Sequence, residues 1–254
     1  MSDTEQSQSS AGRFVKAVKR GATAAWRRHA IERLGPLEDV TITLPRSGAV
    51  YRVTKPVDID SLLNLAESDP EENLPYWAAL WPSGIALADS VLAEPELIRG
   101  KRVLEIGTGL GITAIAAVTT GADLTISDYS DEALRLAAYN IEQNGLKIPA
   151  SMQMNWRSPS DPFRSFAGEG FSVVLAADVL YEQRDVEPLL EIVDWLVAPG
   201  GMLWLAEPRR YAAGRFVDLI DEAGWDGDVE LFEGPWPEME DTGVKVRVHK
   251  LFRP

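Results

Sequence analysis

Three glycines fall within five positions of one segment, EIGTGLG, at Gly107, Gly109 and Gly111. An apolar run precedes this segment and a helical pattern follows it. Glycine permits unusual backbone dihedrals and lets the backbone approach a ligand closely, and the N-terminus of the following helix offers free N–H groups. These residues therefore indicate a nucleotide-binding turn between a strand and a helix.

A second candidate for nucleotide binding is Asp128, which ends the apolar stretch LTISD. An acidic residue at this position of an open α/β sheet accepts hydrogen bonds from ribose hydroxyls. Its alternative role, capping the next helix, suits Ser130 better. A dinucleotide turn requires the spacing G-x-G-x-x-G, whereas this chain has G-x-G-x-G, which disfavours a nicotinamide cofactor without excluding it.

Such residues need a sheet to position them, and the chain alternates between helical and strand patterns from about residue 84. We expect strands at 102–106, 123–127, 150–154, 171–177 and 201–206, and helices at 84–94, 111–120, 130–144, 185–197 and 212–223. Strands separated by helices of this length form a parallel sheet with helices on both faces. We therefore expect a doubly wound, mostly parallel, seven-stranded α/β fold.

The two ends of the chain depart from this alternation. Strands at 228–234 and 243–252 are joined by a connection too short for a parallel crossover, so the last strand should be antiparallel. Upstream, the segment 40–53 predicts a β-hairpin, and 58–68 predicts a helix.

We expect three regions in the chain. Residues 1–35 should form a disordered start and a basic helical leader, because seven of the 25 Lys and Arg residues but only three of the 39 acids lie in 1–34. Residues 36–72 should form the hairpin and helix extension, and residues 73–254 the ligand-binding domain. The leader could bind a membrane surface or a partner, or could simply be a solvated segment.

Composition excludes several classes of function. The chain has no cysteine and two histidines far apart in sequence, so we expect no metal site, no disulfide and no cysteine nucleophile. A net charge of −14 argues against a nucleic-acid partner. We find neither an apolar stretch long enough for a membrane span nor a secretory signal, and we expect a cytoplasmic protein. The sequence does not indicate an oligomeric state.

The glycine turn, the acid after the second strand and the antiparallel end together resemble the class I, or seven-strand, S-adenosylmethionine-dependent methyltransferases. Within that class, the stretches LPYWAALWPSG, NWRSP and AADVLYE resemble methyltransferase family 16, a protein-lysine methyltransferase-like group that includes enzymes acting on electron-transfer flavoprotein β subunit. The resemblance covers about residues 75–252. It implies S-adenosylmethionine as the cofactor and S-adenosylhomocysteine as its product.

The resemblance also implies where the cofactor binds. Glu105 would lie near it, Trp156 against the adenine, and Trp81 at its methionine end, with Tyr129 as a second adenine wall. Glu105 could instead only hydrogen-bond the turn, and Trp156 could only pack. The expected cofactor-binding residues are Trp81, Glu105, Gly107, Gly109, Gly111, Asp128, Tyr129, Trp156 and Ala177.

The candidate catalytic residues are Asp178 and Tyr181, in the sequence Asp-Val-Leu-Tyr that matches the Asp/Glu-x-x-Phe/Tyr motif of the family. A carboxylate at a strand end could hold an incoming amine and orient its lone pair, and an aromatic ring could contact the developing ammonium. Alternatively, Asp178 could cap the next segment and Tyr181 could only pack. Arg209 and Arg210, after the fifth strand, could meet the substrate or form a solvated loop.

Four functions remain open at this point. The first is methylation of a lysine side chain of a protein, and a close alternative is methylation of a small-molecule amine. A nicotinamide-dependent oxidoreductase is disfavoured by the glycine spacing and by the antiparallel end. A cofactor-binding module without catalysis is disfavoured by Asp178.

Overall fold

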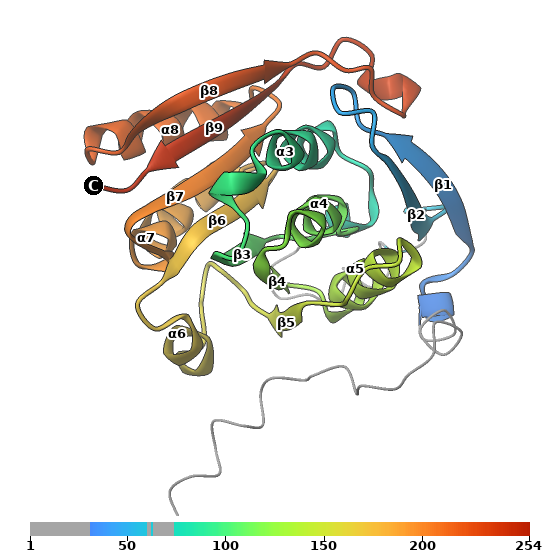
Figure 1. Cartoon of the computed structure of the whole chain (residues 1–254), viewed down its shortest axis with the longest axis horizontal. Coiled ribbons are helices and arrows are strands. Elements are labelled where there is room, and N and C mark those ends of the chain that lie inside the picture. Colours follow the sequence, from blue (N-terminus) through green and yellow to red (C-terminus); the bar gives the residue numbers. More distant parts are fainter. Residues whose placement is uncertain (1–30, 60–61, 63–73) are drawn as a thin grey trace, which may run out of the picture.

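The computed structural model describes residues 31–59, 62 and 74–254, and its centre is a seven-stranded sheet in the order β5-β4-β3-β6-β7-β9-β8 (Figure 1). The strands are β3 (Arg102–Ile106), β4 (Asp123–Asp128), β5 (Ala150–Gln153), β6 (Phe171–Ala177), β7 (Val197–Glu207), β8 (Asp226–Phe232) and β9 (Val246–Phe252). The helices are α3 (Pro82–Ala93), α4 (Ile112–Thr120), α5 (Asp131–Gln143), α6 (Asp161–Ala167), α7 (Val186–Leu196) and α8 (Tyr211–Glu222).

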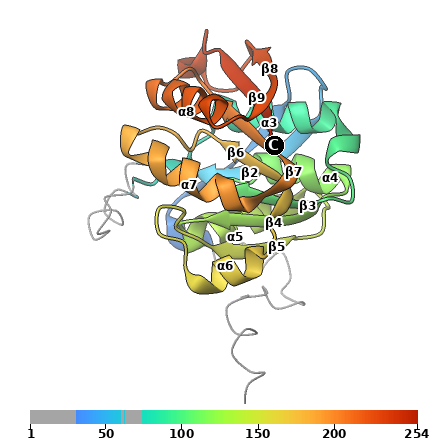
Figure 2. The same ribbon diagram turned by 90° about the vertical axis from the view of Figure 1, so that its left-hand side faces the viewer.

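Helices cover both faces of this sheet, as the alternation of patterns predicts (Figures 1 and 2). Side chains of α3, α4 and α5 belong to one buried apolar cluster, and those of α6, α7 and α8 belong to the other. Strand β9 pairs antiparallel with both β7 and β8, which confirms the predicted antiparallel end. The doubly wound, mostly parallel fold is therefore confirmed.

Two elements differ from the expected ones. Helix α6 is absent from the sequence-based list because it has only seven residues and contains Pro162, so its periodic pattern is short. Strand β7 begins at Val197 rather than at residue 201, and it pairs with β6 at Phe171 across an irregular register. Other boundaries agree to within a few residues, and Ser130 caps α5 by accepting a hydrogen bond from the Ala133 N–H.

The expected N-terminal hairpin is present as β1 (Leu37–Thr43) and β2 (Val50–Pro56), which pair antiparallel. The buried side chain of Asn140 attaches it to α5. Asn140 accepts a hydrogen bond from the Thr54 N–H at 2.8 Å and donates to the Thr54 carbonyl at 3.1 Å. The same amide donates to the Leu110 carbonyl at 2.9 Å, so one side chain joins the hairpin to the glycine turn.

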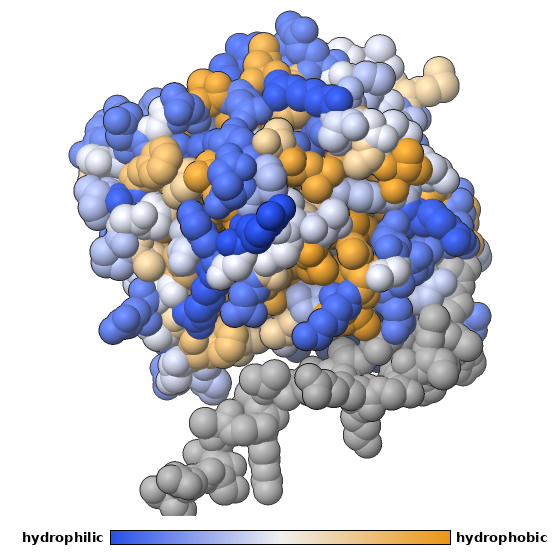
Figure 3. Space-filling view, viewed as in Figure 1, coloured by the Kyte–Doolittle hydropathy of each residue, from blue (hydrophilic) through white to orange (hydrophobic). Residues whose placement is uncertain are grey.

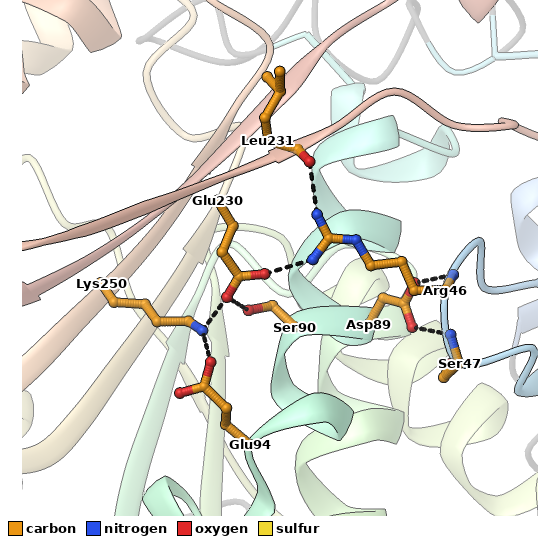
Figure 4. A network of polar contacts seen from close by, with 8 residues as sticks. All are labelled: Arg46, Ser47, Asp89, Ser90, Glu94, Glu230, Leu231 and Lys250. Atoms are coloured by element: carbon orange, nitrogen blue, oxygen red, sulfur yellow. Dashed lines mark hydrogen bonds and ion pairs between the residues drawn. The ribbon is translucent and has the colours of Figure 1, made fainter.

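The tip of this hairpin is attached to the C-terminal strands by a polar network (Figure 4). Arg46 donates to the Glu230 carboxylate on β8, and the buried Asp89 of α3 accepts from the backbone N–H groups of Arg46 and Ser47. The ammonium of Lys250 on β9 also pairs with Glu230. The hairpin is therefore tied directly to α3 and β8, and through Glu230 to β9.

Some expectations concern residues outside those that the structure describes. The disordered start and nearly all of the basic helix at 12–34 lie outside the described residues, as does most of the helix expected at 58–68, and the three-region division stays a prediction. Within the part of the chain that the structure describes, no helix has the length and apolarity needed to cross a membrane. Hydrophilic groups cover much of the face in Figure 3, and apolar groups gather near its middle.

We predict that Gly111→Ala lowers the free energy of unfolding by about 2–4 kcal/mol in urea denaturation. Gly111 has φ +80°, and a Cβ there would lie 2.9 Å from the Cβ of Ala137 on α5. Both backbone strain and overpacking therefore act against the substitution.

The matched control is Gly214→Ala on α8, where φ is not positive and an added Cβ meets no atom within 4 Å. It should raise the free energy of unfolding by about 0.5–1 kcal/mol, because alanine loses less backbone entropy in a helix. Equal effects of the two substitutions would contradict the packing described for Gly111.

Candidate functional site

A pocket lies at the carboxyl ends of β3, β4 and β6, where an open α/β sheet binds its ligands. It brings together every predicted site residue except Gly111. The predicted residues in its lining are Trp81, Glu105, Gly107, Gly109, Asp128, Tyr129, Trp156, Ala177, Asp178 and Tyr181.

The glycine turn makes close backbone approaches that a side chain would block. Gly107 and Gly109 have positive φ, and a Cβ on Gly109 would lie 3.2 Å from the carbonyl oxygen of Trp77. Gly111 has a different position, because it precedes α4 and faces Ala137 rather than the pocket. Of the three glycines, two shape the pocket and the third lets α4 pack against α5.

Asp128 connects the end of β4 to the glycine turn. One carboxylate oxygen accepts a hydrogen bond from the Gly109 N–H at 3.0 Å, and the other accepts from the Ser130 N–H at 3.0 Å. Burial raises the pKa of this carboxyl to about 6, although the backbone N–H groups oppose the shift. The Tyr129 N–H also bonds this carboxylate, and these donors do not fill its roughly four lone-pair sites, so it can still accept a hydrogen bond from a ligand.

Glu105 lies beneath the turn and is almost fully buried. Its carboxylate accepts a hydrogen bond from the Thr108 hydroxyl at 2.8 Å. Burial raises the pKa of Glu105 to about 8, and the nearby charge of Asp128 adds to that shift. The carboxyl is therefore mostly protonated at neutral pH and can donate a hydrogen bond as well as accept one.

Aromatic side chains form one wall of the pocket beside Asp178. The ring of Tyr76 lies 5.1 Å from that of Tyr181 and 6.1 Å from that of Trp81, both in edge-to-face geometry. The Trp81 indole N–H donates to the Tyr76 carbonyl at 2.8 Å. Tyr76 is a site residue that the sequence analysis missed, although it lies within the aromatic-rich stretch LPYWAALWPSG.

A buried ion pair, also unpredicted, joins two loops that carry lining residues of the pocket. Arg157 follows Trp156 directly, and its Nε donates to the fully buried carboxylate of Asp185 at 2.8 Å. Asp185 ends the short helix η5 (Gln183–Asp185), just after Tyr181. The pair therefore fixes the loop that carries Trp156 relative to the loop that carries Tyr181.

Asp178 has an unusual backbone and a charged partner. Its φ is +54°, in the left-handed region, and its N–H donates to the Ala206 carbonyl on β7 at 2.9 Å. One oxygen of its nearly buried carboxylate accepts from the Arg210 Nε at 2.8 Å, and the other accepts from the Ser83 hydroxyl at 3.4 Å. The sequence alone leaves two roles open for Arg210, and the structure places it on Asp178.

The strand order, the single antiparallel strand and a pocket above the glycine turn define the class I methyltransferase fold. The N-methyltransferase NodS from Bradyrhizobium japonicum, solved in complex with S-adenosyl-L-homocysteine, superposes with a TM-score of 0.55 over 77% of this chain and 98% of that one. The sequence identity is 16%, so this likeness shows the fold alone.

The family model described as "Lysine methyltransferase" matches residues 65–223, and the chain belongs to that family. Rat electron transfer flavoprotein beta subunit lysine methyltransferase is 44% identical over 141 residues, which is 54% of this chain and 51% of that protein. Calmodulin-lysine N-methyltransferase from Arabidopsis thaliana is 31% identical over 198 residues, which is 73% of this chain and 64% of that protein. This chain spans about half the length of most of the curated relatives that it matches.

We predict that Glu105 makes stability depend on pH. Its pKa is raised from 4.5 to about 8 in the fold, so between these values the folded chain holds a proton that the unfolded chain releases. The free energy of unfolding should therefore fall as pH rises through this window, by up to about 1.4 kcal/mol per pH unit from this group.

Urea denaturation of the wild type and of Glu105→Gln at pH 6, 7 and 8 measures this contribution, because glutamine keeps the shape but cannot ionise. The wild type should lose stability relative to the variant as the pH rises. A difference between the two proteins that stays constant with pH would contradict the raised pKa.

Proposed function

We propose that this chain is an S-adenosylmethionine-dependent methyltransferase whose acceptor is a lysine side chain of a protein. The observation that carries the proposal is the position of Asp178, whose carboxylate lines the same pocket as the glycine turn. Membership of the lysine methyltransferase family supports both the donor and the acceptor.

The residues of the pocket fit the donor. Asp128 has free lone pairs for the ribose hydroxyls, and Tyr129 and Trp156 offer flat surfaces on which an adenine can stack. At the other end, Trp81 and Glu105 lie near the place that we assign to the methionine portion. The two glycines of the lining keep the turn open for close approach.

The bound donor supplies an activated methyl group on a sulfonium, so that the amine lone pair forms the new C–N bond as the C–S bond breaks. The chain has to align the amine and keep water away. Asp178 would accept a hydrogen bond from the amine N–H and so orient its lone pair. The rings of Tyr76, Trp81 and Tyr181 would exclude water and stabilise the ammonium product through their faces.

Relatives in the family are named for protein substrates, which are electron transfer flavoprotein beta subunit and calmodulin. We therefore propose a protein with an accessible lysine as the acceptor class for this chain. A net charge of −14 argues against nucleic acid as the acceptor.

Donor binding is tested by calorimetry with S-adenosylhomocysteine. We predict that the wild type binds and that Asp128→Ala raises the Kd by about 10–100-fold, because charge-assisted hydrogen bonds are lost. The exposed Asp123, at the other end of β4, is the control, and Asp123→Ala should leave the Kd within about twofold, since such surface changes have small effects. A wild type that does not bind, or that binds NADH instead, would remove the donor assignment.

Acceptor chemistry is tested by incubating the chain and methyl-labelled donor with a cell extract. We predict a labelled protein band whose rate of formation falls about 10²-fold in Asp178→Asn, because the amine loses its orienting carboxylate. Donor binding should persist in this variant.

The control is Asp218→Asn on the exposed face of α8, which should label at the wild-type rate. Label confined to small molecules would indicate a small-molecule amine as the acceptor. Equal labelling by Asp178→Asn and the wild type would contradict the role of Asp178.

A further inference from the structure

A cation of the chain itself occupies the carboxylate that the acceptor amine needs. Arg210 follows β7 and bonds the Asp178 carboxylate through Nε at 2.8 Å. Its guanidinium lies 5.8 Å from the centre of the Trp81 ring. The proposed function places the lysine amine at a carboxylate beside an aromatic wall. In this structure, Arg210 already occupies that position.

This ion pair cannot simply be broken. The Asp178 side chain is 6% exposed, and a nearly buried carboxylate that loses its partner is strongly destabilised. An arriving lysine ammonium can replace the guanidinium on Asp178, and it must release one proton to solvent before its lone pair can form the new C–N bond. The displaced Arg210, whose side chain is 36% exposed, is then open both to water and to another anion.

A second cleft lies next to the donor pocket, and the two share Trp81. The lining residues that bear charge are Arg209, Arg210, Asp241 and Lys245. Three of these are cations and one is an anion, in a chain whose net charge is −14. Because two of the three cations already pair with carboxylates, the attraction that the cleft offers to an acidic segment depends on which cation is unpaired.

The cations of this cleft differ in their availability. Lys245 pairs with Glu233, and Arg210 pairs with Asp178. Arg209 is exposed, and no ion pair joins it to any residue that the structure describes. Arg209 can therefore attract a carboxylate into the cleft without losing a partner of its own.

The backbone is strained at Asp178 and at Arg209, the residue before Arg210. Among the described residues other than glycine, positive φ occurs at Asp178 (+54°) and at Arg209 (+65°). They follow the ends of the neighbouring strands β6 and β7, which pair through Ala177 and Ala206. Strain of this kind persists where the surrounding structure holds it, and it clusters at functional sites.

We propose that Arg210 is a specificity-determining residue that holds the acceptor position on Asp178, and that the enzyme selects lysines lying beside an acidic side chain. The lysine pairs with the nearly buried Asp178 while the neighbouring carboxylate of the acceptor pairs with the partly exposed Arg210, so that both charges keep a partner. This inference rests on the proposed function, and it narrows the acceptor class to a lysine with a nearby carboxylate.

The experiment uses two short capped peptides with one central lysine, flanked by glutamates in one peptide and by glutamines in the other. We expect wild-type kcat/KM to be about tenfold higher for the glutamate peptide, as one charge-assisted hydrogen bond provides. Arg210→Ala should remove this preference, and Arg210→Lys, which keeps a cation, should retain part of it. The matched control is Arg215→Ala on the exposed face of α8, which should keep the full preference.

Three outcomes would overturn the inference. These are equal wild-type rates for the two peptides, transfer to neither of them, and a preference that persists in Arg210→Ala. Within the chain, Asp241 is the other carboxylate that the displaced Arg210 could pair with. If the wild type methylates both peptides at equal rates, and Asp241→Asn lowers both rates to the same extent, the guanidinium pairs with Asp241 instead of with the acceptor. Failure of S-adenosylhomocysteine binding, or an extract without any labelled protein, would instead remove the proposed function.

Discussion

Backbone hydrogen bonds to the Asp128 carboxylate hold together the parts from which the pocket is made. They join the end of β4 to the turn that follows β3 and to the start of α5, through the N–H groups of Gly109 and Ser130. Because Asp128 is buried, its charge depends on these donors for solvation. The shape of the glycine turn, the burial of Glu105 beneath it and the start of α5 all depend on this arrangement.

The N-terminal hairpin supports the same turn from outside the sheet. Asn140 bonds Thr54 of the hairpin and Leu110 of the turn with a single buried amide. At the other end of the hairpin, Arg46 and Asp89 tie its tip to α3 and β8. The hairpin thus belongs to the same folded unit as the sheet, and the turn is supported by three segments that are distant in sequence.

Local patterns predicted most of the fold and much of the candidate site. The alternation of helices and strands depends on periodicity within each segment, and Gly107, Gly109 and Asp128 follow from their positions at strand ends. The Arg157–Asp185 and Arg210–Asp178 pairs join residues 28 and 32 positions apart, so only the folded chain shows them. Gly111 matched the motif, but the approach of α5 that explains its position is a tertiary contact and leaves no local pattern.

Trp81 forms a wall of both the donor pocket and the neighbouring cleft, and its ring is held by Tyr76 through an edge contact and an indole hydrogen bond. Because one fixed ring bounds both spaces, a substitution at Trp81 reshapes the two together, and neither wall can change alone.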